Sequence, residues 1–377
     1  MPQQKPQSAQ QLFYEPISGH AFNADLTQIV VSNSTPHTHV MKRGADGKYT
    51  EGHVLEQHLE RVTSVDWAPT SNRIVTCAGD RNAYVWNFEQ ESGTWIPCLV
   101  LLRINRAATT VRWSPAEDRF AVGSGARLLS VCYFDPENNW WVSKHIKKPI
   151  RSTILSVDWH PSNHLIAVGS CDFKCRVFSA ALKEMSDKPQ TSLWMPKLSK
   201  FGTLLAEFDS NNGWVHGVKF SPSGNLLAWV AHDSSVNLVN SNSLEKVHTV
   251  LTSNLPYMCL LWLSEGSFVT AGHNMSPDLY YASENGVTFG AKLDVKKEKA
   301  ASGNMSAMAR FQKLDVQGKA ETEGTTLETT HANCITEIRA MESANNKVTK
   351  FSTSGKDGKV VIWDTESICS AIAGLKI

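Results

Sequence analysis

Short stretches of alternating apolar and polar residues, separated by turn-forming residues, recur along this chain of 377 residues. They are clearest in residues 58–88, where VTSVDWA (62–68) and NAYVWNF (82–88) alternate and RIVTCA (73–78) is apolar and β-branched. Asn, Ser and Pro occupy the positions between them. Alternation with a period of two is typical of β-strands rather than helices. These residues therefore predict three consecutive short strands.

The first of these strands is the start of a repeating unit. Trp67 and Trp113 lie 46 residues apart near the ends of similar strands, and Trp159 follows after another 46 residues. The same position recurs in seven units, which are marked by Phe22, Trp67, Trp113, Trp159, Phe220, Trp262 and Ala340. A period of about 40–45 residues with four strands in each unit is typical of WD repeats. The chain is therefore predicted to be all-β, a single seven-bladed WD-repeat β-propeller over residues 1–377.

A recurring set of polar residues supports this prediction. In two units a His, a Thr, an Asp and a Trp keep the same spacing from the strand that marks the unit. The two sets are His58, Thr76, Asp80 and Trp86, and His331, Thr353, Asp357 and Trp363. Such a set would satisfy the buried donors of a tight turn. The alternative, a catalytic set, is disfavoured because an active site would not occur twice.

The two ends of the chain carry further predictions. Residues 1–10 are polar and are expected to form a flexible tail. Residues 11–17 are predicted to be a strand that completes the last blade and closes the ring, because closure removes an open sheet edge. Residues 366–377 place Ile368, Ile372 and Leu375 at helical spacing, which predicts a C-terminal helix.

Composition restricts the function classes. The net charge of +1 does not favour a nucleic-acid partner. The eight cysteines form no CxxC pair, which indicates buried free thiols in a reducing cytosol rather than disulfides or zinc ligands. Since no apolar run reaches about 18 residues and the polar N-terminus has no signal-peptide core, we expect a cytoplasmic protein without membrane insertion.

Motifs for catalysis are absent from the sequence. It contains no phosphate-binding loop, nucleophile elbow, HExxH motif or dinucleotide fingerprint, so we expect no enzyme and no cofactor. The two histidines of PHTH (36–39) could contact a metal, but no third ligand is evident, so the sequence favours ordinary loop or strand residues.

Two surfaces are candidates for protein binding. Basic residues gather in the predicted connections between blades, namely Arg103, Arg106, Lys144, Lys147, Lys148 and Arg151. They would either dock an acidic protein surface or form solvated loops. Trp95, Trp140 and Trp141 fall in predicted outer strands, where they either pack between blades at the rim or contribute to a partner site.

Two inserts interrupt the repeat. The first, residues 179–204, is polar with isolated apolar residues and is expected to pack those residues on the rim. The second, residues 292–328, lies between blades 6 and 7 and is charged at both ends. Its segment 303–316 predicts a short projecting helix with an apolar stripe of Met305, Met308, Phe311 and Leu314. A helix this short needs a surface, so it would dock on a partner, fold back on the propeller or remain disordered.

Several stretches resemble one WD-repeat family closely: RVTSVDWAPTSNRIVTCAGDRNAYVW, WWVSKHIKKPIRSTILSVDWHP, NMSAMARFQKLD and KDGKVVIWDTES. They are similar to subunit 1 of the actin-related protein 2/3 complex along essentially the whole chain. The resemblance implies a non-enzymatic structural subunit that supports nucleation of branched actin filaments at cortical actin patches. Its implied partners are the other subunits of the complex, actin, and the acidic tails of nucleation-promoting factors. It also implies that Met305, Met308 and Phe311 are contact residues of the insert.

Two alternatives from other classes stand beside this one. A WD-repeat protein can be a scaffold or substrate receptor in another assembly, such as a ubiquitin ligase, and a propeller can carry an enzyme. The fold alone does not distinguish them. The actin-nucleation subunit predicts co-purification with actin-related proteins, whereas another scaffold predicts different partners.

Overall fold

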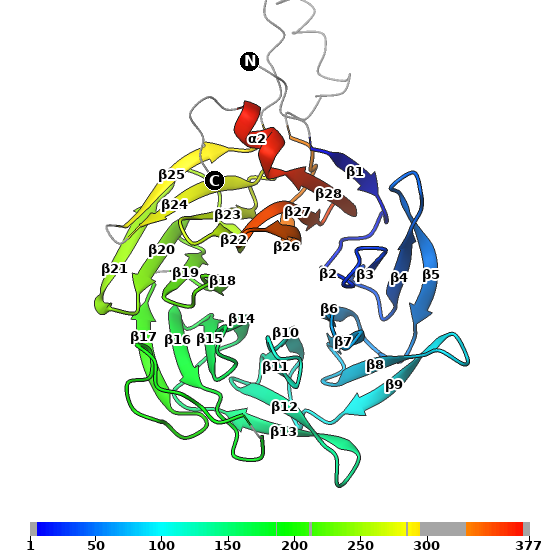
Figure 1. The fold of residues 1–377 in the computed structure, drawn as a ribbon, viewed down its shortest axis with the longest axis horizontal. Helices are drawn as coiled ribbons and strands as arrows, with labels where there is room; N and C mark the ends of the chain where they lie inside the picture. The colour runs from blue at the N-terminus through cyan, green and yellow to red at the C-terminus, as the bar shows by residue number, and fades with distance from the viewer. Residues whose placement is uncertain (1–5, 186, 211–212, 284–285, 295–328, 372–377) are drawn as a thin grey trace, which may run out of the picture.

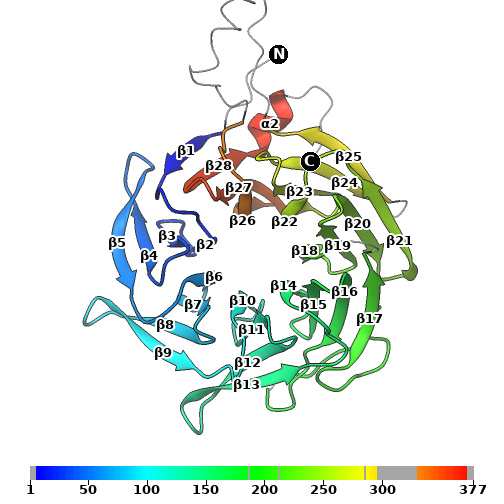
Figure 2. The same ribbon diagram turned by 180° about the vertical axis from the view of Figure 1, so that it is seen from behind.

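Seven antiparallel sheets of four strands each surround a central axis like blades (Figure 1). The structure of the protein is a computed structural model, and it describes residues 6–185, 187–210, 213–283, 286–294 and 329–371. Seen from behind, the same ring is closed on all sides (Figure 2). The prediction of an all-β, seven-bladed WD-repeat propeller is confirmed.

Each blade contributes its strands from the axis outward, in chain order for blades 1 to 6. The innermost strands are β2 (Gly19–Phe22), β6 (Val62–Ala68), β10 (Ala108–Trp113), β14 (Ile154–Trp159), β18 (Val215–Phe220), β22 (Tyr257–Ser264) and β26 (Ile335–Ala344). The second strands are β3 (Gln28–Ser32), β7 (Arg73–Ala78), β11 (Arg119–Ser124), β15 (Leu165–Ser170), β19 (Leu226–Ala231), β23 (Ser267–Gly272) and β27 (Lys347–Gly355). Each residue that marked the repeat lies in one of the innermost strands.

The remaining strands form the outer half of each blade. The third strands are β4 (Thr38–Arg43), β8 (Ala83–Glu89), β12 (Leu129–Asp135), β16 (Lys174–Ser179), β20 (Ser235–Asn240), β24 (Asp278–Ser283) and β28 (Lys359–Asp364). The outermost strands are β5 (Tyr49–Leu55), β9 (Thr94–Val100), β13 (Trp140–Ile146), β17 (Leu204–Asp209), β21 (Ser243–Leu251), β25 (Gly286–Lys292) and, in blade 7, β1 (Ser8–Gln11).

The N-terminal strand of blade 7 corrects the sequence prediction. β1 pairs antiparallel with β28, but it covers residues 8–11, within the expected tail, rather than 11–17. This strand has no buried residue, so no apolar alternation marks it. The apolar residues that suggested a strand instead anchor the following connection, where Ile17 is fully buried and Leu12 and Phe13 pack in blade 1.

At the other end, α2 (Thr365–Ala371) begins directly after β28, one residue before the expected helix. The Asp364 carboxylate accepts hydrogen bonds from the backbone N–H groups of Glu366 and Ser367, as a helix cap does. Ile368 is buried against the core of blade 7, which holds the helix on the propeller. Residues 372–377, with the expected positions Ile372 and Leu375, lie outside the described residues.

Large aromatic side chains fill the spaces between and within blades. Trp95 and Trp141 are buried, so these outer-strand residues pack in the core, whereas Trp140 is 56% exposed. Trp141 contacts the rings of Trp113 and Phe120, which joins the outer and inner strands of blade 3. Of the two alternatives for the rim tryptophans, core packing therefore holds for Trp95 and Trp141 and leaves only Trp140 on the surface.

Candidate protein-binding face

Strand direction sorts the connections of the propeller onto two faces. Because successive strands are antiparallel, the turn between the second and third strands lies on the same face as the connection to the next blade. We call this the upper face and the opposite one the lower face. A hydrogen bond in blade 4 shows that these two connections lie on one face. Asp172, in the turn between β15 and β16, accepts it at 2.8 Å from the backbone N–H of Arg151, in the connection between β13 and β14.

The four polar residues of blade 2 form one connected network at the upper face. His58 contacts Asp80 and Thr76 through its two ring nitrogens, at 2.8 Å each. With Nδ1 donating to Asp80, Nε2 accepts from the Thr76 hydroxyl, which accepts in turn from the Trp86 indole at 3.0 Å. The Asp80 carboxylate also accepts the backbone N–H of Leu59. Each buried group of the set has a partner, which is the arrangement of a structural network.

Blade 7 repeats this geometry. His331 lies 3.1 Å from both carboxylate oxygens of Asp357 and 2.8 Å from the hydroxyl of Thr353, which accepts from the Trp363 indole at 2.9 Å. Burial alone would raise the pKa of Asp357, but the hydrogen bonds from His331 and from the Ala332 N–H hold it below its usual value. The duplication and the full burial of His331 support the structural interpretation over the catalytic one.

Blade 6 replaces the set with residues that the sequence pattern did not reveal. The Tyr257 hydroxyl donates to Asp278 at 2.6 Å and lies 3.0 Å from the Tyr280 hydroxyl. Asn254 and Asn274 donate amide N–H groups to the same carboxylate oxygen of Asp278. Burial nevertheless raises the pKa of Asp278 to about 6. Without a His and a Trp at the repeat spacing, no sequence signal pointed to this network.

Five of the six basic residues that the sequence singled out lie on the upper face and are exposed: Arg103, Arg106, Lys147, Lys148 and Arg151. The Arg103 guanidinium donates to the backbone carbonyl of Ser143, which ties its connection to β13. The sixth residue, Lys144, was wrongly placed in a connection. It lies within the outermost strand β13 and pairs with Glu184.

Three further arginines on the same face were missed. Arg61, Arg81 and Arg127 are exposed in upper-face loops beside the predicted residues. Arg81 and Arg127 have φ values of 71° and 58°, in the left-handed region, at the turn position where blade 7 has Gly358. Phe173 and Ser234 are also left-handed at the corresponding turns of blades 4 and 5, so this conformation belongs to the repeat and places the two arginines at equivalent positions.

Together these residues form what we call the basic upper face, over blades 2 to 4. Its members are Arg61, Arg81, Arg103, Arg106, Arg127, Lys147, Lys148 and Arg151. None of the eight side chains forms an ion pair with another residue in the described ranges. Because no ion pair of the described structure compensates their positive charge, they produce a local positive potential on a protein with a net charge of only +1.

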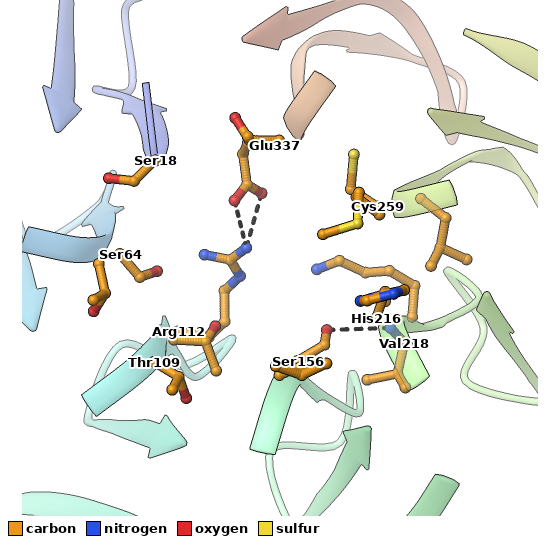
Figure 3. A pocket seen from close by; sticks show the side chains of 17 residues that line it. Ser18, Ser64, Thr109, Arg112, Ser156, His216, Val218, Cys259 and Glu337 are labelled. Carbon is orange, nitrogen blue, oxygen red and sulfur yellow. Dashed lines mark hydrogen bonds and ion pairs between the residues drawn. The ribbon is translucent and has the colours of Figure 1, made fainter. Parts of the chain in front are cut away.

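The charges at the hub, in contrast, are paired. A cavity of about 160 Å³ is lined there by Ser and Thr hydroxyls together with Arg112, Lys219 and Glu337 (Figure 3). Arg112 donates to both carboxylate oxygens of Glu337, at 2.8 and 2.9 Å, and Lys219 pairs with Asp158. Although burial would raise the pKa of Glu337, Arg112 and Arg339 hold it at about 2. The charged side chains at the hub therefore stabilise the contacts between blades and, unlike those of the basic upper face, are held in ion pairs.

The ends of the second insert are joined at the upper face, between blades 6 and 7. The Asp294 carboxylate accepts hydrogen bonds from the backbone N–H and the hydroxyl of Thr330, at 2.5 and 3.1 Å. Lys359 donates to the carbonyl of Thr330 at 3.0 Å. The predicted contact residues Met305, Met308, Phe311 and Leu314 lie outside the described residues.

The described part of the chain meets neither the requirements of a metal site nor those of a membrane-spanning helix. No group of three His, Cys, Asp or Glu residues there is arranged to hold a metal ion, and His39 of the PHTH segment contacts Glu51 instead. Seven cysteines, among them Cys171 and Cys175, are free thiols. None of the helices described is long and apolar enough to cross a membrane.

Comparisons with known proteins agree with the fold and extend over the whole chain. The family described as "WD domain, G-beta repeat" matches residues 49–87, 144–179 and 202–240. "Actin-related protein 2/3 complex subunit 1A-A" of Xenopus laevis is 51% identical over 373 residues, which cover 98% of this chain and 100% of that protein. "Actin-related protein 2/3 complex subunit 1" of Schizosaccharomyces pombe is 44% identical, over 93% and 97% of the two chains. Subunit 1A of Arabidopsis thaliana is 39% identical, over 94% and 96%.

Proposed function

The chain belongs to the actin-related protein 2/3 complex subunit 1 family, and on that premise we propose that it is a non-catalytic scaffold subunit of such a complex. In this role it supports the nucleation of branched actin filaments, in the cytoplasm and at cortical actin patches. Its partners are the other subunits, actin and nucleation-promoting factors. Similarity along the full length to relatives named for one complex favours this function over a scaffold role in another assembly.

The observation that carries the proposal is the basic upper face. Eight exposed cationic side chains, none of them in an ion pair with a residue that the structure describes, cover adjacent blades. A flexible acidic segment can follow such a surface, because the attraction depends on summed charge rather than on one rigid contact. The acidic tail of a nucleation-promoting factor has the required charge, and salt would weaken its binding.

The second insert supplies the other proposed contact. The hydrogen bonds between Asp294 and Thr330 hold the two described ends of the insert together at one point of the upper face. This arrangement lets the insert carry a binding segment without altering the blades. We assign the actin contact to Met305, Met308, Phe311 and Leu314, whose apolar stripe fits helix-in-groove docking.

The test uses the assembled complex with a charge-reversal variant, Arg106→Glu combined with Lys148→Glu. Two reversed charges at roughly 0.7 kcal/mol or more each weaken binding of an acidic-tail peptide by about tenfold or more. Fluorescence anisotropy of a labelled peptide measures the affinity. The matched control reverses two exposed lysines away from this face, Lys42 and Lys246. Equal affinity of the test variant and the control at low salt contradicts the assignment.

A further inference from the structure

The first insert forms an ordered strap on the opposite side of the propeller. The described residues 180–185 and 187–203, which we call the strap, lie between β16 and β17 at the lower face, beside the rim (Figure 1). The corresponding connection in blade 2, residues 90–93, is a short turn. The strap is fixed by Trp194, whose indole N–H donates to the carbonyl of Gly224 in blade 5 at 2.7 Å.

Ion pairs fix the strap at two more points. The Arg119 guanidinium, which is fully buried, donates to Asp187 of the strap at 2.7 Å and to Asp118. Asn163 donates to the same Asp187 carboxylate. At the rim, Glu184 pairs with Lys144 of β13. If the strap moved, the buried Arg119 would lose one of its two carboxylate partners and keep only Asp118, so these contacts oppose its release.

Only some of the apolar and charged side chains of the strap contact the propeller. Leu182, Trp194 and Met195 are buried, which meets its need for apolar anchoring. Leu193 and Leu198 are 51% and 63% exposed on the same ordered segment. Its two described acidic residues are both in ion pairs, whereas four exposed lysines are in none within the described ranges: Lys183, Lys188, Lys197 and Lys200. The outward side of the strap is therefore apolar and positive.

We propose that the strap is a docking surface for a partner subunit, which presents a segment with apolar side chains flanked by Asp or Glu. Charge complementarity selects this occupant, because four exposed lysines outside any ion pair of the described structure repel a basic partner. It also disfavours a second copy of this chain, since a two-fold interface would place like charges against each other. The inference rests on the proposed function, because the partner belongs to the complex.

The experiment co-expresses the full chain with the remaining subunits and measures how much of it enters the complex by size-exclusion chromatography. One variant carries Leu193→Asp with Leu198→Asp, and another carries Lys197→Glu with Lys200→Glu. The matched control is Leu255→Asp, a leucine that is 60% exposed on the upper face. Thermal unfolding of each isolated chain verifies that it folds.

Both strap variants are expected to reduce incorporation at least about fivefold relative to the control, with unchanged melting temperature. Incorporation equal to that of the wild type in both variants overturns the proposal. So does a concentration-dependent dimer of the isolated wild-type chain that the strap variants abolish, because it assigns the surface to a second copy. Loss of acidic-tail binding in the basic-face variant, with normal assembly of the strap variants, refutes only this inference.

Discussion

The buried carboxylate of Asp278 makes stability depend on pH in a direction opposite to that of most acidic residues. Its side chain is 1% exposed, and one of its two oxygens has no hydrogen-bond partner in the described structure. Burial raises its pKa from 3.8 to about 6. A difference of about two units corresponds to about 3 kcal/mol at 1.36 kcal/mol per unit.

The sign follows from linkage. Because the pKa in the folded state lies above that in the unfolded state, the group contributes stability below about pH 4 that is lost as the pH rises to about 6. Asparagine does not titrate, so the stability of an Asp278→Asn variant lacks this loss. About 1 kcal/mol of the loss is already present at pH 4.5, so the difference in unfolding free energy, variant minus wild type, should be about 2 kcal/mol more favourable at pH 7.5 than at pH 4.5.

Urea denaturation of both proteins at the two pH values measures this change. Any pH-independent effect of the substitution on the free energy of unfolding, such as that of an unpaired amide N–H, is the same at both pH values and therefore cancels in the comparison. Asp46→Asn, in an exposed turn, is the matched control and should show no comparable change. A difference for Asp278→Asn that stays within about 0.5 kcal/mol between the two pH values would refute the assigned burial of a charged carboxylate.

Two further predictions concern the networks at the upper face. Asp357→Ala leaves the N–H groups of His331 and Ala332 without an acceptor and should destabilise the protein by about 1–3 kcal/mol, which a lower melting temperature would show and an unchanged one would contradict. Deletion of residues 302–316 should leave the melting temperature unchanged because the hydrogen bonds between Asp294 and Thr330 remain, while it should slow branching in a pyrene-actin assay. Unchanged branching would remove the proposed role of the insert.

The sequence predicted the strands that bury one face and missed the strand that does not. Apolar alternation identified β6 and the spacing of Trp67 and Trp113 identified β10, and both strands bury apolar side chains in the core. β1 is held by backbone hydrogen bonds to β28 and has no buried residue, so nothing in its composition distinguishes it from a polar tail. Ladder hydrogen bonds are independent of side-chain type, which is why pairing at an outer edge is invisible to a hydrophobicity pattern.

The polar networks also show where prediction from the sequence stops. The sets of blades 2 and 7 were predictable because His, Thr, Asp and Trp recur at fixed spacing. In blade 6, Tyr257 and Tyr280 provide the hydroxyls around Asp278, and the same need for buried hydrogen bonds is met by other residues. A physical requirement therefore persists where its sequence motif does not.

The basic upper face could have been found in full by applying the repeat to charge as well as to strands. Arg81 and Arg127 each lie 14 residues after the tryptophan that marks their unit, so they occupy the same turn position in neighbouring blades. Arg61, Arg106 and Arg151 each lie within three residues of the start of an innermost strand. Residues at equivalent positions of successive blades must share one face, because each blade repeats the same strand directions. Charges about 45 residues apart in sequence thus become neighbours on the surface, which is what a long acidic segment needs in order to bind across several blades.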